Sequence, residues 1–153
     1  MLSRNEYYVE ILEYPKEELF EIAEKAAAFI LHSIKDKYGE NDTPYDLTID
    51  LVFTYAFHDG YVTPEKRRLI KEIFETDLPD DELLGLAKYH AEEDREKRDK
   101  ILKELRKDDE FADAEFLLAI CIYALDGEIT KEEQDFVEKN LRQDIIKQKK
   151  GNA

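Results

Sequence analysis

The feature that most constrains the fold is a turn that the chain contains twice. The stretch "FHDGYVT" begins at residue 57, and "ALDGEIT" follows sixty-seven positions later. In both copies an Asp-Gly pair is followed by one variable residue, then an apolar residue and Thr. Glycine readily takes the left-handed conformation that ends a helix, and threonine caps the start of the next helix. The repeat therefore predicts two helix-turn-helix hairpins.

The similarity extends beyond the turns when residues 46–74 are aligned with residues 113–141. Six of the 29 aligned pairs are identical, and most identities lie at the turn. The identical pairs are Asp46 and Asp113, Leu51 and Leu118, Asp59 and Asp126, Gly60 and Gly127, Thr63 and Thr130, and Glu65 and Glu132. We interpret this pattern as an internal duplication. Glu133, three residues after Thr130, also predicts a capping box, whereas the first copy has Lys66 at that place.

Apolar residues elsewhere recur mostly at helical spacing, and they predict an all-α protein with at least six helices and no sheet. Helices are expected within residues 5–38, ending at Gly39, and from Thr63, Asp81, Phe111 and Thr130. The stretch "LTIDLVFTY" fits a strand as well as a helix. Because Thr43-Pro44 is a typical helix start, we expect a helix here too, with Thr43 as its cap.

The length of 153 residues suits one domain, which we place over residues 1–153 with a motif-bearing core at 43–142 and a loose tail at 147–153. The net charge of −15 would repel nucleic acid and anionic membranes, so other proteins are the expected partners. The chain shows no secretory signal and no apolar run that could insert into a membrane, and a cytoplasmic location is expected. The sequence does not indicate an oligomeric state.

Several single residues have ordinary structural interpretations. Cys121 lies in an apolar run and is expected to be a small buried residue. His32 and His90 lie on or near apolar stripes and are expected to pack in the core. Phe136 and Val137 are expected to face the core from the last helix, together with Leu141. The charged segment 92–110 is expected to be a solvated helical face with opposite charges one turn apart.

At the two turns the chain resembles the TerB-like domains, a family named for the tellurite-resistance protein TerB and also found in the DjlA co-chaperone. That family is all-helical and internally duplicated, and each half carries a motif close to Asp-Gly-x-Ile/Val-Ser/Thr-x-x-Glu. Here the acidic residues Glu65 and Glu132 fall one place earlier than in that pattern. The resemblance implies a link to tellurite or stress resistance in bacteria and a non-enzymatic binding or scaffold role.

The resemblance also implies that the two hairpins lie side by side. Carboxylates from Asp59, Glu65, Asp126 and Glu132 would then converge, and their mutual repulsion would favour a bound Ca²⁺ or Mg²⁺. The alternative is that the two aspartates only satisfy the amides of their turns. No organic cofactor is expected.

Two other types of site can contain Asp-Gly turns. An EF-hand would require oxygen ligands at Tyr55 and Phe57 in the first copy and is rejected. A metal-dependent HD-type phosphohydrolase would use the dyad His58-Asp59 together with His32 upstream and the distant Asp126, and it stays the alternative function. Because the residue aligned with His58 is Leu125, and nothing resembles a nucleophile beside a base, we expect no enzyme.

Overall fold

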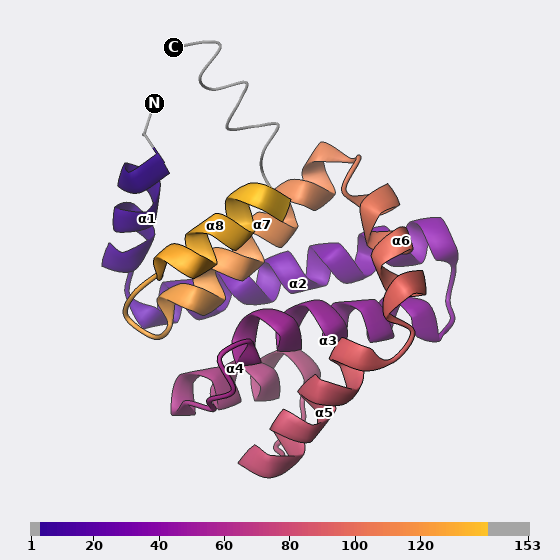
Figure 1. The fold of residues 1–153 in the computed structure, drawn as a ribbon, viewed down its shortest axis with the longest axis horizontal. Coiled ribbons are helices and arrows are strands. Elements are labelled where there is room, and N and C mark those ends of the chain that lie inside the picture. Colours follow the sequence, from indigo (N-terminus) through magenta and orange to yellow (C-terminus); the bar gives the residue numbers. More distant parts are fainter. Residues whose placement is uncertain (1–3, 141–153) are drawn as a thin grey trace.

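The computed structural model describes residues 4–140, and this part of the chain folds into eight helices with no strand (Figure 1). The helices are α1 (Arg4–Glu13), α2 (Lys16–Tyr38), α3 (Asp42–Phe57), α4 (Pro64–Phe74), α5 (Asp80–Glu92), α6 (Arg95–Leu105), α7 (Asp109–Ala124) and α8 (Lys131–Asn140). The all-α prediction is confirmed. Leu141 and the expected loose tail lie outside the described residues.

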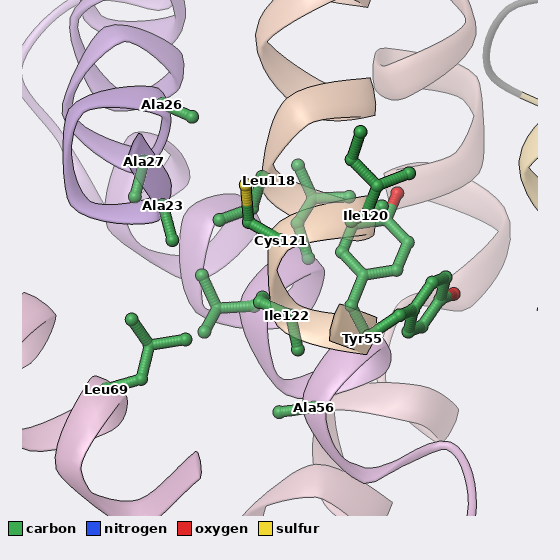
Figure 2. Packing of buried hydrophobic residues seen from close by; sticks show 14 of the residues in the cluster. Ala23, Ala26, Ala27, Tyr55, Ala56, Leu69, Leu118, Ile120, Cys121 and Ile122 are labelled. Carbon is green, nitrogen blue, oxygen red and sulfur yellow. The ribbon is translucent and has the colours of Figure 1, made fainter. Parts of the chain in front are cut away.

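The core is built around α2, α3 and α7. Figure 1 shows α2 and α3 running side by side through the middle of the molecule, and α2 packs most extensively against α7. Alanines of α2 face larger apolar side chains of α7 in Figure 2: Ala23 and Ala27 lie opposite Leu118 and Cys121. Small residues on one helix allow the two backbones to approach closely, which explains why the apolar stripe of α2 is rich in alanine.

The ambiguous stretch "LTIDLVFTY" forms the middle of α3. Its apolar residues fit both patterns because α3 is covered on several sides, so that neighbouring residues such as Leu51, Val52 and Phe53 are all buried. The helix prediction is right, but the predicted cap is wrong. The side chain of Asn41 accepts a hydrogen bond from the amide of Thr43 at 2.8 Å and caps the helix in place of Thr43.

The helix bounds repeat with the spacing of the sequence repeat. Helices α3 and α7 each have 16 residues, and adding sixty-seven to both ends of α3 gives both ends of α7. The same addition takes the start of α4 at Pro64 to the start of α8 at Lys131. The glycines of the two turns have φ angles of 78° and 86°, both left-handed as expected. Duplication of the three-dimensional hairpin stays a prediction that superposition of the two would test.

The charged segment is more deeply involved in the fold than the sequence indicates. The helix that begins at Asp80 ends at Glu92, and Asp94, with φ 50°, separates it from α6. Arg98 on α6 is buried, and its guanidinium group donates to the backbone oxygen of His90 at 2.8 Å. Surface pairs one turn apart do occur, such as Arg95 with Asp99, but the segment is not simply a solvated face.

Burial confirms some of the single-residue predictions and contradicts others. Cys121, His90 and Val137 are buried as expected, and burial raises the pKa of the Cys121 thiol to about 12. His32 is exposed, so its predicted core position is wrong. Phe136 is 39% exposed, and its prediction is wrong as well, because the side of α8 that faces the core is occupied by Glu133 and Val137. None of the described helices is long and apolar enough to span a bilayer.

Candidate functional site

The two Asp-Gly turns meet at a buried lysine. The amino group of Lys66 lies 3.3 Å from the carboxylate of Asp59 in the first turn and 3.2 Å from that of Asp126 in the second. The Lys66 side chain is only 1% exposed, while the two carboxylates keep 34% and 23% of their surface. A lysine can be buried in this way only when its charge is paired. The ammonium group therefore lies where the sequence predicted a divalent cation between these two aspartates.

Local structure explains how the lysine reaches this position. Thr63 caps α4, and its hydroxyl accepts a hydrogen bond from the amide of Lys66 at 3.2 Å. A side chain three residues after a helix cap lies on the same side as the cap, and here that side faces the turns. Asp59 also accepts a bond from the amide of Tyr61 at 3.1 Å. Burial alone would raise the pKa of Asp59, but the Tyr61 amide and the Lys66 charge outweigh it and lower this pKa.

The equivalent position after the second cap holds Glu133, which is also buried. The predicted capping box is confirmed: the amide of Thr130 donates to Glu133 at 2.8 Å, and the amide of Glu133 donates to the Thr130 hydroxyl at 3.1 Å. The second carboxylate oxygen of Glu133 lies 2.7 Å from Nε2 of His58. This bond with Glu133 is the main reason that the pKa of His58 is raised. His58 and Glu133 are thus a second link between the first turn and α8.

The other two predicted ligands lie elsewhere. The carboxylate of Glu65 is 2.8 Å from the amino group of Lys16 at the start of α2, and Glu132 is exposed on α8. Within residues 4–140, no group of three or more His, Cys, Asp and Glu side chains is placed to hold a metal ion. Asp59 and Asp126 come together, but they do so on an amino group. Binding of Ca²⁺ or Mg²⁺ stays a prediction.

A signal for the inward residues was present in the sequence. The family pattern places its acidic residue three positions after the Thr or Ser, which corresponds to Lys66 and Glu133 here. Glu65 and Glu132 are identical in the two aligned copies, but they lie one position earlier on the helix and point to another side. A cap and the third residue after it share a face, so the position alone could have identified both residues. Lys66 and Glu133 also carry opposite charges, so each would favour a partner of the opposite charge in the other hairpin.

Two further buried carboxylates were missed by the sequence analysis. Asp50 on α3 is 1% exposed and accepts two bonds of 2.9 Å from Arg95 on α6. Glu115 on α7 is fully buried and accepts bonds of 2.8 and 2.7 Å from Arg106, and it also accepts a bond from the Tyr55 hydroxyl. Paired, bidentate geometry of this kind is what makes a buried carboxylate tolerable. The charged segment is therefore attached to α3 and α7 through its arginines.

The arrangement at the turns suits a structural junction. Lys66 and His58 of the first hairpin bond to Asp126 and Glu133 of the second. The first hairpin therefore contributes the basic groups of these two contacts, and the second contributes the carboxylates. Among the buried side-chain polar atoms of the described residues, none lacks a hydrogen-bond partner. Comparison of the chain with models of protein families, with curated proteins and with solved structures found no match.

Proposed function

We propose that this chain is a non-enzymatic, TerB-like binding or scaffold module with a role in tellurite or stress resistance. The observation that supports it best is the pairing at the turns, where the ionisable groups bond to one another. In a hydrolytic site such groups would face a cavity that holds a metal and water. The resemblance in the two turn motifs supports the family and the resistance role.

We also propose that the Lys66 ammonium takes the place of a divalent cation at the junction of the turns. Its distances of 3.3 and 3.2 Å to the two aspartates are within the range of ion pairs, and its burial leaves little access from solvent. An ammonium group neutralises one unit of charge and needs no ligand set of six or more oxygens. The two aspartates still need a positive charge between them, and the chain itself supplies it.

The surface offers apolar side chains for a protein partner. Tyr61 at the first turn is 73% exposed, and Val9, Tyr45 and Tyr89 are at least half exposed. Exposed aromatic residues are typical of protein interfaces, and the net charge of −15 would attract a basic partner over distance.

The alternative of an HD-type phosphohydrolase makes a clear experimental demand on His58. Its imidazole would have to be neutral to bind a metal, whereas its bond with Glu133 raises its pKa and favours the charged form. Purified wild-type protein and the variants His58→Ala and His32→Ala should be incubated with nucleotides and Mn²⁺. We expect the three proteins to show the same background. Cleavage by wild type that requires Mn²⁺ and is abolished in His58→Ala would establish the hydrolase instead.

The binding role needs its own measurement. Cross-linking in cells followed by mass spectrometry would identify partners, and each would then be purified and titrated with the full chain by calorimetry. We expect at least one purified protein to bind with a defined stoichiometry. If no purified candidate binds, the scaffold proposal is wrong.

A further inference from the structure

A groove of about 480 Å³ lies where α2, α3 and α4 meet, away from the two turns. Its apolar lining comes from Ala27, Ala28 and Leu31 of α2 and from Ile73 and Phe74 at the end of α4. Tyr45 of α3 also lines the groove, and half of its surface is exposed. The face of this ring already attracts one cation, because Nζ of Lys35 lies 4.9 Å from its centroid.

Two neighbouring carboxyl groups line the same groove. Glu24 of α2 and Glu72 of α4 lie close enough to influence one another's ionisation, and Glu75 adds a third carboxyl group. Burial, followed by the interaction with Glu72, raises the pKa of Glu24. Neighbouring carboxylates repel each other, so a cation placed beside Glu24 and Glu72 would be stabilised.

The charged neighbours of Glu24 and Glu72 balance this negative charge only in part. Arg68 lies one turn before Glu72 on α4, and its Nε is 2.9 Å from that carboxylate. The remaining guanidinium nitrogens are committed to Glu17, with two bonds of 2.8 Å. Glu21, the other carboxylate near Glu24 on α2, is paired with Lys25. The single positive charge of Arg68 is thus shared among three carboxyl groups, those of Glu17, Glu24 and Glu72.

We propose that this groove docks a basic side chain, lysine or arginine, that a partner protein presents within an apolar segment. The methylene stem would lie on the alanines, Leu31 and Phe74, and the charged end would reach Glu24 and Glu72. Apolar stems with charged tips bind in this manner to surfaces of mixed character. The inference rests on the proposed function as a protein-binding module and names the chemistry of the partner. Phosphate-bearing partners are disfavoured because three carboxylates line the groove.

The test uses the full chain, labelled with ¹⁵N, and the pentapeptide acetyl-Leu-Arg-Leu-Lys-Leu-amide as the probe. Two variants address the groove separately: Glu24→Gln removes one carboxyl group, and Ala28→Leu fills the groove from an exposed helical position without changing the charge. The matched controls are Glu92→Gln and Ala91→Leu, which make the same changes at exposed positions of α5. A second peptide, with glutamine in place of both basic residues, controls for apolar binding.

We expect amide shifts in α2, α3 and α4, with a Kd that rises about tenfold or more in both groove variants and about twofold or less in both controls. Calorimetry in two buffers of different ionisation enthalpy should show proton release on binding, because a bound cation lowers the raised pKa of Glu24. Equal losses in groove and control variants, or equal binding of the glutamine peptide, would overturn the docking proposal. In that case a purified partner that still binds would leave the scaffold function standing.

Discussion

The amino group of Lys66 in the first hairpin lies 3.2 Å from the carboxylate of Asp126 in the second. Neither residue can keep this geometry unless the two hairpins are held in one arrangement, and the contact is nearly closed to water on the lysine side. Buried, paired charges of this kind contribute specificity of packing more reliably than they contribute stability. Substitutions at this contact can therefore test how the two hairpins are joined.

Replacement of Lys66 by Met should destabilise the fold by about 2 kcal/mol, since charged hydrogen bonds are lost and two carboxylates are left facing each other. Calcium in the millimolar range should then raise the Tm of Lys66→Met by more than it raises that of wild type, because an external cation can enter where the ammonium has been removed. Thermal melting of both proteins with and without calcium measures this. The triple variant Lys66→Met, Asp59→Asn, Asp126→Asn is the control and should lose the response. A larger calcium effect in wild type would support the original metal prediction.

The bond between His58 and Glu133 should make stability depend on pH. The pKa of His58 is raised in the folded protein, mainly by its bond with Glu133, so its contribution is complete below the ordinary imidazole pKa of 6.5. The contribution is lost as the pH rises through the folded value. Urea unfolding of wild type and His58→Gln should therefore differ more at about pH 5.5 than at about pH 8.5. A difference that grows with rising pH would show that His58 is not paired in this way.

The buried carboxylate of Glu115 should be among the most sensitive points of the fold. Arg106→Met leaves this fully buried group without its ion-pair partner and should cost about 3–5 kcal/mol. Tyr55→Phe removes one neutral donor and should cost about 1–2 kcal/mol. Chemical denaturation measures both values. If Arg106→Met lowers the free energy of unfolding by no more than Tyr55→Phe does, the guanidinium group of Arg106 is not paired with Glu115 when the protein is in solution.

The two turn glycines should respond alike to alanine. Gly60→Ala and Gly127→Ala place a side chain at φ 78° and 86°, and each should destabilise by about 1 kcal/mol through backbone strain alone, because nothing lies within 4 Å of either new Cβ. Gly85→Ala is the matched control: it also meets open space, but it lies inside α5 and should stabilise by about 0.5–1 kcal/mol. Stabilisation at either turn would mean that the turn does not need the left-handed conformation.

Much of the fold could be predicted from the sequence because the signals were local. The caps at Thr63 and Thr130, and the glycines at 39, 60 and 127, act on atoms within a few residues, and the structure has them as expected. The start of α3 was misassigned for the same reason, since Asn41 and Thr43 are both good caps and their local signals compete. Apolar periodicity identified the helices. The burial that it predicted for His32 and Phe136 was wrong, because an apolar stripe does not indicate which of its edges the neighbouring helices cover.

The pairing of charges was decided by the tertiary structure. By sequence, the spacing from each cap could place Glu65 and Glu132 on another side of their helices, but it could not show that Asp59 and Asp126 meet at Lys66. Likewise, the arginines of the charged segment looked like surface residues until α6 was placed against Asp50 and Glu115. Charges act through space over several ångströms in whatever arrangement packing creates, whereas caps and turns act along the chain. The sequence by itself therefore determined the helices and their two repeated turns, and only the packing of the hairpins decided which charges meet.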